Sequence, residues 1–289
     1  MPELQPPAPN VIDALVRAAL EEDGAHDDVT TRVLVLLGQW GAGAIVAKDD
    51  GIVSGLPVAA AAMTALDPEV AVDTLVADGE RVSVGTRLAE VEGSLASILA
   101  SERVALNFLQ HMSGIATLTR EFVDAVVGTK AVILDTRKTT PGLRQVERYA
   151  VRCGGGQNHR YNLTSGLLIK DNHIAAVYAR GIDDLSDVIT LARQTAPHTM
   201  RIEVEVTNVA MLNEALTGGA DIILLDNMTT ADMATCVEIV AGRALIEASG
   251  GVTLDNVRAI AATGVDYISI GRLTHSAPAL DISLDIGEG

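Results

Sequence analysis

Residues 221–227 read Asp-Ile-Ile-Leu-Leu-Asp-Asn, an apolar run of strand length followed at once by a carboxylate and an amide. The segment 202–206, Ile-Glu-Val-Glu-Val, is a second strand candidate that carries carboxylates. Further short apolar runs lie at 131–134, 167–169, 244–246 and 267–270, and helical patterns separate them. Regular alternation of strands and helices predicts a parallel sheet.

Polar residues follow almost every one of these predicted strands. The sets are Asp135-Thr136-Arg137-Lys138, Lys170-Asp171-Asn172-His173, Glu205, Asp226-Asn227, Glu247 with Ser249-Gly250-Gly251, and Gly271 with His275. A TIM-type barrel builds its site in this way, from the carboxyl ends of its strands. Since a complete barrel takes about 250 residues, the sequence after residue 113 is too short for one, and we expect a partial, open α/β barrel.

The first third of the chain has a different pattern. Short apolar segments at 42–47, 51–55, 70–75 and 88–91 predict a small sheet, and 10–23 and 56–66 predict helices. Residues 94–127 predict a long helix with a possible break at Ser113-Gly114. We therefore expect an N-terminal α+β domain over 1–112, joined by the C-terminal tail 277–289, and an α/β-barrel catalytic domain over 113–276.

Charge and composition exclude several classes of partner. The 289 residues include 21 Lys and Arg against 38 Asp and Glu, which gives a net charge of −17. An acidic surface repels nucleic acid and anionic lipid, and only 2% of the residues are aromatic, so we expect neither partner. Two cysteines, no signal-peptide pattern and no apolar run near 20 residues indicate a cytoplasmic protein.

Positive charge is nevertheless concentrated at the predicted strand ends. Lysine occurs at only four positions, two of which, Lys138 and Lys170, follow strands; Arg137, Arg144, His159 and Arg160 lie in the same regions. Arginine forks and lysine ammonium groups suit a small polyanion with carboxylates or phosphates. The alternative is that these side chains only solvate loops or pair with local carboxylates.

Carboxylates and glycines complete the candidate site. Glu205 and Asp226, at successive strand ends, suit ribose hydroxyls or a polyphosphate-bound Mg²⁺, although Asp226 is also placed to cap a helix. Glu203 should share the face of Glu205. The glycines at 154–156 fit the end of a helix rather than a dinucleotide motif, and 249–251 and 271–273 suit a phosphate.

Longer motifs join these residues. They are Asp135-Thr136-Arg137-Lys138-Thr139-Thr140-Pro141-Gly142-Leu143-Arg144, Asn158-His159-Arg160 after the glycines, Leu168-Ile169-Lys170-Asp171-Asn172-His173, Glu102-Arg103-Val104-Ala105-Leu106-Asn107, Leu225-Asp226-Asn227, Ala248-Ser249-Gly250-Gly251 and Leu273-Thr274-His275-Ser276. Together they closely resemble the family of quinolinate phosphoribosyltransferases, or nicotinate-nucleotide pyrophosphorylases (carboxylating). The resemblance covers most of the chain.

The resemblance implies a type II phosphoribosyltransferase: an open N-terminal sandwich and a partial α/β barrel, assembled as a homodimer. It implies a pentosyltransferase of NAD biosynthesis that joins quinolinate to phosphoribosyl diphosphate (PRPP) and yields nicotinate mononucleotide, CO₂ and pyrophosphate. Mg²⁺ bound with PRPP is the implied cofactor.

Site residues follow from the same resemblance. The implied quinolinate ligands are Thr136, Arg137, Lys138, His159, Arg160, Lys170 and, from the partner subunit, Arg103. The implied PRPP ligands are Lys138, Lys170, Asn172, His173, Glu205, Asp226, Ser249, Gly250, Gly251, Gly271, Arg272, Leu273 and His275. Lys138, Lys170, Glu205 and Asp226 are the implied catalytic residues, and Glu205 and Asp226 hold the metal directly or through water or PRPP.

Three positions depart from the family pattern: Arg148, Ser165 and Arg272. One alternative is a molybdenum-transport-associated homologue, which the intact Asn158-His159-Arg160 motif disfavours. Another is a protein that binds PRPP or pyridine carboxylates without turnover. A Schiff-base aldolase acting through Lys170 is the alternative from another enzyme class.

Overall fold

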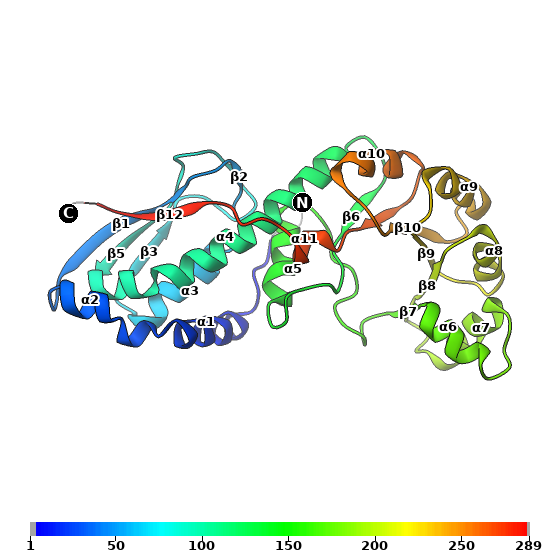
Figure 1. The fold of residues 1–289 in the computed structure, drawn as a ribbon, viewed down its shortest axis with the longest axis horizontal. Coiled ribbons are helices and arrows are strands. Elements are labelled where there is room, and N and C mark those ends of the chain that lie inside the picture. Colours follow the sequence, from blue (N-terminus) through cyan, green and yellow to red (C-terminus); the bar gives the residue numbers. More distant parts are fainter. Residues whose placement is uncertain (1–3, 288–289) are drawn as a thin grey trace. The chain divides into compact units, whose positions relative to one another are not determined.

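The computed structural model describes residues 4–287, which form two compact units (Figure 1). One unit contains the described residues up to 120, 138–156 and those from 272 on; the other contains 121–137 and 157–271. The two are described in turn.

The first unit is built on an antiparallel sheet. Its strands are β1 (Trp40–Ala47), β3 (Ala71–Thr74), β5 (Arg87–Ser94) and β12 (Ile282–Gly287), paired in the order β12-β1-β5-β3. Two short strands, β2 (Gly51–Ile52) and β4 (Arg81–Val82), pair separately. Because β12 pairs with β1 from Ala42↔Gly287 to Ala47↔Ile282, the C-terminal segment completes the N-terminal sheet.

Helices supply the rest of this unit. They are α1 (Pro9–Asp23), η1 (Ala25–Asp27), α2 (Val29–Leu34), α3 (Leu56–Leu66), most of α4 (Leu95–Ala125), α5 (Arg144–Cys153) and α11 (Arg272–His275). Ile12, Val16 and Leu20 recur every four residues in α1, so they share one face, and all three are buried. Gly154 is the C-cap of α5, which confirms that these glycines end a helix.

The expected break of the long helix at Ser113-Gly114 is wrong, because α4 runs through both residues. Ser113 is buried, and its hydroxyl accepts a hydrogen bond from the Ser54 amide and donates one to the Ser54 carbonyl. A Cβ on Gly114 would lie 1.9 Å from the Pro278 carbonyl oxygen. The glycine therefore permits close approach of the chain to a helix rather than ending it.

The second unit is an open parallel sheet. Its strands are β6 (Val132–Leu134), β7 (Leu167–Ile169), β8 (Ile202–Val206), β9 (Ile222–Asp226), β10 (Leu245–Ser249) and β11 (Tyr267–Ser269), in the order β6-β11-β10-β9-β8-β7. Every neighbouring pair is parallel, and among the described residues β6 and β7 are the two edges of this sheet. The expectation of a partial α/β barrel together with an α+β domain is confirmed.

The helices of this unit are α6 (Asp171–Tyr178), α7 (Leu185–Thr195), α8 (Val209–Thr217), α9 (Thr230–Val240) and α10 (Leu254–Ala262). Figure 1 shows α7, α8 and α9 along the outer side of the arc formed by β7 to β10. None of the described helices combines the length and the apolar content that crossing a membrane needs.

Candidate active site

The carboxyl ends of the parallel strands gather polar side chains at one edge of the sheet. Asp226 is the last residue of β9 and lies in register with Ser249, the last residue of β10. Ser249 in turn accepts a hydrogen bond from the Ser269 hydroxyl at 3.0 Å. Asp226 does not cap α9, because the N-cap is Thr229, which accepts from the Asp232 amide. The capping alternative for Asp226 is therefore wrong.

A fully buried carboxylate, Asp135, organises the segment that carries the predicted cations. It follows β6, accepts the His159 main-chain amide at 2.8 Å and accepts Asn158 Nδ2 at 2.6 Å. Gln157 also bridges to β6 through its main chain. Residues 157–159 are thus fixed against the strand.

The His159 ring lies between two buried glutamates from different strands. Its Nε2 is 3.4 Å from Oε2 of Glu203 on β8 and 3.4 Å from Oε2 of Glu247 on β10. Glu203 is 5% exposed and Glu247 is 2% exposed. Burial alone would lower the pKa of His159, but hydrogen bonding and charge from the two glutamates outweigh it and raise the pKa to about 10.

The other ring nitrogen, Nδ1, accepts the main-chain amide of Arg160 at 2.7 Å. A protonated Nδ1 has no lone pair for that bond, so the ring carries its proton on Nε2. That contact therefore belongs to the neutral ring, whereas the raised pKa of His159 favours the doubly protonated ring near neutral pH, in which both nitrogens are donors. Burial raises the pKa of Glu203 as well.

The same three residues also have donor atoms of a type that bind metals. One ligand atom from each of His159, Glu203 and Glu247 lies within 4.8 Å of the others, close enough to hold a metal ion. Oε1 of Glu203 and Oε1 of Glu247 are buried without a hydrogen-bond partner. These residues are distinct from the pair predicted to hold a metal, Glu205 and Asp226.

Two arginines are close enough to repel each other. Burial lowers the pKa of Arg160, and the positive charge of Arg137 lowers it further, while Glu203 opposes both effects. Arg160 Nη1 donates to the Gly166 carbonyl at 2.9 Å, and Arg137 Nε is buried with no hydrogen-bond partner. Two guanidinium groups held together in this way provide a place for an anion with two charges.

Lys170 and Glu205 form an ion pair across the ends of β7 and β8, with Nζ 2.5 Å from Oε2. The Lys170 amide donates to Nδ1 of His173, which starts the capping of α6. Asn172 and His173 are exposed in the first turn of that helix. The Glu205 carboxylate is therefore matched by a cation before any ligand binds.

Backbone geometry fixes the glycine segment after β10. Gly250 has φ +88°, and a Cβ there would lie 2.3 Å from Oδ1 of Asn227, so no other residue fits without displacement. Asn227 also donates through Nδ2 to Asp226 at 2.9 Å. The glycine backbone and the carboxylate thus lie against the same amide side chain.

Several of the remaining predicted residues belong to the first unit. Arg103 is exposed on α4, Lys138 and Arg272 are exposed, Leu273 is buried, and His275 is exposed with its ring 2.6 Å from the Ser276 hydroxyl. The Thr274 hydroxyl donates to the Lys138 carbonyl at 2.7 Å. Among the departures from the family pattern, Arg148 is buried on α5 and Ser165 is exposed.

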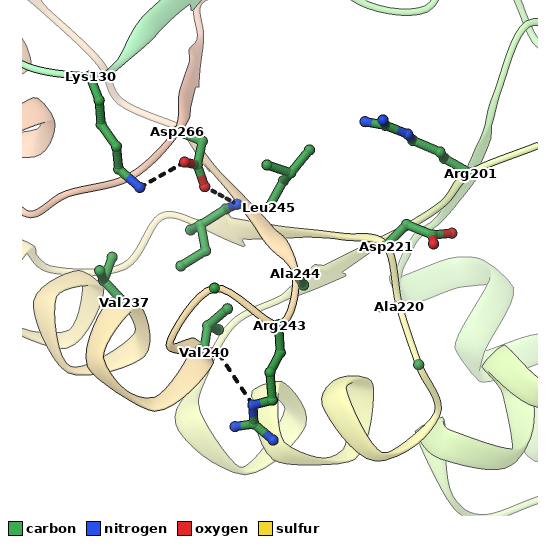
Figure 2. Close-up of a pocket in the computed structure, with 13 residues that line it drawn as sticks. Lys130, Arg201, Ala220, Asp221, Val237, Val240, Arg243, Ala244, Leu245 and Asp266 are labelled. Carbon is green, nitrogen blue, oxygen red and sulfur yellow. Dashed lines mark hydrogen bonds and ion pairs between the residues drawn. The ribbon is translucent and has the colours of Figure 1, made fainter.

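Two cavities lie in the second unit. One, of about 600 Å³, is lined by Asn158, His159, Arg160, Glu203 and Glu247 among others. The other, of about 560 Å³, lies at the amino ends of the strands (Figure 2). There Asp266 accepts from both Lys130 Nζ and the Ile246 amide, and Arg243 donates to the Val240 carbonyl. Lys130 is therefore paired with a carboxylate, and Arg201 also lines this cavity.

Comparison with known families assigns nearly the whole chain. Residues 28–113 match the N-terminal domain of quinolinate phosphoribosyl transferase, and residues 115–285 match its C-terminal domain. The chain belongs to the quinolinate phosphoribosyltransferase family. The resemblance found in the sequence motifs is thereby confirmed.

Individual relatives of this family align over most of their length. A probable nicotinate-nucleotide pyrophosphorylase (carboxylating) from Synechocystis is 42% identical over 96% of this chain and 92% of its own. The Mycobacterium leprae enzyme of that name is 42% identical over 94% and 95%. The structure of the nicotinate-nucleotide pyrophosphorylase from Francisella tularensis has a TM-score of 0.91 at 36% identity and covers 99% of both chains.

Three residues near the site were noted in the sequence but not assigned to it: Asp135 and Glu247 at strand ends, and Glu203 within a strand. The alternation of Glu203 with Glu205 placed Glu203 on the inner face of the sheet. No feature of the sequence indicates that a histidine from the 157–160 segment would lie between two strands that are not neighbours.

Proposed function

We propose that this protein transfers the phosphoribosyl group of PRPP to quinolinate and decarboxylates the product. The quinolinate nitrogen forms a bond to the anomeric carbon as the bond from that carbon to pyrophosphate breaks, and pyrophosphate leaves with the electron pair. The carboxylate next to the ring nitrogen then departs as CO₂, and a proton from solvent takes its place. The products are nicotinate mononucleotide, CO₂ and pyrophosphate.

The observation that carries this proposal is the pair of arginines Arg137, which follows β6, and Arg160, which lies between α5 and β7. Arg137 depresses the pKa of Arg160, so the two charges repel when no ligand is bound. A dicarboxylate such as quinolinate relieves that repulsion, and each hydrogen bond to a charged group contributes about 1.5–3 kcal/mol. The arrangement thus favours a planar dianion.

The neighbouring residues suit the sugar and phosphates of PRPP. Positive charge develops on the ribose as pyrophosphate leaves, and the carboxylates of Glu205 and Asp226 stabilise it. Lys170 pairs with Glu205 at the strand ends, and from there its ammonium group can also bind a diphosphate oxygen of PRPP. The backbone of 249–251, followed by α10, suits the 5′-phosphate.

Decarboxylation needs little further help from the protein. Once the nitrogen carries the ribose, the pyridinium charge stabilises the electron pair left on the adjacent carbon. The task of the arginines is then to orient the ring so that the correct carboxylate is lost.

Mg²⁺ is part of the proposal. Glu205 and Asp226 close neighbouring strands β8 and β9, and a pair of carboxylates is the donor set that Mg²⁺ prefers beside substrate phosphates. These two residues would hold the ion, directly or through water or PRPP, and the ion would neutralise diphosphate charge.

We further propose that the protein is a cytoplasmic homodimer, with an N-terminal domain over 1–112 joined by 277–289 and a catalytic domain over 113–276. Large apolar side chains are exposed on and after α2, among them Val33, Leu34, Leu36 and Leu37, all at least 74% exposed. Apolar residues gathered in this way mark interaction surfaces. Arg103 on α4 is exposed, with Nη2 4.0 Å from Oε1 of Glu102, and it would reach a partner subunit's site.

The test is a turnover assay with quinolinate, PRPP and Mg²⁺, in which nicotinate mononucleotide is separated by chromatography and CO₂ is trapped. We expect both products in equal amounts. Tight binding of quinolinate without CO₂ would show a binder instead. A covalent adduct at Lys170 after borohydride treatment with a carbonyl substrate would show an aldolase.

A further inference from the structure

The segment that carries Lys138 has no regular secondary structure of its own. It lies between the end of β6 at Leu134 and the start of α5 at Arg144, and Lys138 is exposed. A long side chain on such a segment can serve a reaction only if the main chain beneath it is held in place. The contacts of the main chain around Lys138 therefore decide where its ammonium group can lie.

Side chains of α5 and α11, both in the first unit, hold two successive residues of this segment (Figure 1). The Thr274 hydroxyl donates to the Lys138 carbonyl at 2.7 Å. Arg144 Nε donates to the Thr139 hydroxyl at 3.0 Å. Both contacts are made by groups at the surface or only partly buried, so a third contact with a buried anchor has the larger effect on the position of the segment.

That third contact is made by Glu147, whose carboxylate is fully buried in the first turn of α5. Its Oε2 accepts the main-chain amide of Thr140 at 3.0 Å. Its Oε1 lies 3.0 Å from Nε2 of His111 on α4. Burying a carboxylate is costly unless its oxygens are paired. Each oxygen has one of these two partners, and Glu147 thus joins α4 to the Lys138 segment.

The direction of the bond between His111 and Glu147 follows from its acceptor. A carboxylate can only accept, so Nε2 of His111 carries a proton and donates it. The His111 side chain is 32% exposed, whereas that of Glu147 is 0% exposed. Without the His111 donor, Oε1 would be buried and unpaired, and the carboxylate would turn toward another donor and release the Thr140 amide.

We propose that His111 and Glu147 are positioning residues for Lys138. His111 orients the Glu147 carboxylate, whose other oxygen holds the Thr140 amide and with it the main chain that carries Lys138. Neither His111 nor Glu147 touches a substrate in this assignment. The inference rests on the proposed function, because that function takes Lys138 as a ligand of quinolinate and PRPP.

The first test compares His111→Gln with His111→Asn. The glutamine amide nitrogen reaches about as far from the main chain as Nε2 does, whereas the shorter asparagine places its amide near the position of Nδ1. We expect His111→Gln to keep kcat and the calorimetric Kd for PRPP within about threefold. We expect His111→Asn to lower kcat about tenfold and to raise that Kd about fivefold.

The control for both variants is His26→Asn, on the exposed η1 of the same unit, which should change neither kcat nor the Kd. Losses in His111→Gln that equal or exceed those in His111→Asn would mean that the ring acts in some other way, and they would overturn the proposal. No loss in either variant would overturn it as well.

A double variant shows whether His111 acts through Lys138. We expect Lys138→Ala and the double variant Lys138→Ala with His111→Asn to bind PRPP with Kd values within about twofold of each other, because the lysine that His111 positions is already gone. A loss of stability unrelated to Lys138 would instead add to the effect of Lys138→Ala. A further rise of about fivefold in the double variant would therefore overturn the proposal.

Hydrogen–deuterium exchange of residues 138–143 measures the main chain directly and needs no substrate. We expect exchange there to be about tenfold faster than in the native protein in His111→Asn and in Glu147→Asp, whose carboxylate is one methylene shorter, and native-like in His111→Gln. Unchanged exchange in His111→Asn, or faster exchange along all of α5, would overturn the proposal. If the protein shows no turnover, the proposed function fails, while the exchange rates and the PRPP Kd still decide the roles of His111 and Glu147.

Discussion

Replacing Arg137 by alanine tests the anion clamp most directly. Arg137 follows β6 and is half-buried, and its Nε has no hydrogen-bond partner in the protein, which leaves that donor for a ligand. Two charge-assisted bonds to one carboxylate, at about 1.5 kcal/mol each, amount to about 3 kcal/mol, or about a hundredfold in kcat/KM for quinolinate. Loss of the repulsion between Arg137 and Arg160 offsets part of this, which is why we take the lower value.

The assay is initial-rate formation of nicotinate mononucleotide against quinolinate at saturating PRPP. Arg137→Lys is the matched control, because it keeps the charge but loses the planar fork. We expect Arg137→Lys to lower kcat/KM for quinolinate about tenfold, a value between those of the native protein and Arg137→Ala. A kcat/KM for Arg137→Ala within threefold of the native value, or an equal rise in the KM for PRPP, would refute the clamp.

Three further changes separate chemistry from stability. Asp226→Asn should lower kcat about tenfold or more without lowering Tm. Thr229→Ala removes the cap of α9 and should lower the unfolding free energy by about 1 kcal/mol while leaving kcat unchanged. A loss of stability in Asp226→Asn together with a loss of kcat in Thr229→Ala would exchange their roles. Gly114→Ala should destabilise by about 1–3 kcal/mol in urea, because its Cβ meets a backbone oxygen; a stable variant would contradict this. Burial raises the pKa of Asp78 above 3.8, so the stability that its proton contributes is present in acid and is lost as the pH rises through the raised pKa. Asp78→Asn should therefore flatten the fall of the unfolding free energy with pH above about pH 4. The same fall in the variant and the native protein would contradict this.

Most of the fold could be predicted from local pattern. The parallel strand at 222–226 is a continuous apolar run that ends on a carboxylate, and the strand at 202–206 alternates apolar residues with glutamates; both patterns predict strands. The course of α4 could not, because Ser113 and Gly114 look like a helix end until their contacts with Ser54 and Pro278 are known. Tertiary packing, not local preference, decides such positions.

The candidate site was predictable in its residue types but not in its pairing. Strand ends placed Arg137, Lys170, Glu205 and Asp226 at one edge, since parallel strands end together. The ion pair of Lys170 with Glu205 spans two neighbouring strands and follows from that order. The position of His159 depends on how the 157–160 segment crosses the interior, which no spacing along the chain records.

The net charge of −17 is consistent with a site for two polyanions because the opposing charges occupy different depths. Arg137, after β6, and Arg160, in the 157–160 segment, are half-buried, while Asp135, Glu203 and Glu247 lie buried around that segment. The buried carboxylates offset the charge of the cations, and Glu203 and Glu247 line the same cavity as Arg160. An acidic protein can therefore present a cationic site, and replacing one of those carboxylates should weaken substrate binding even though it removes a negative charge.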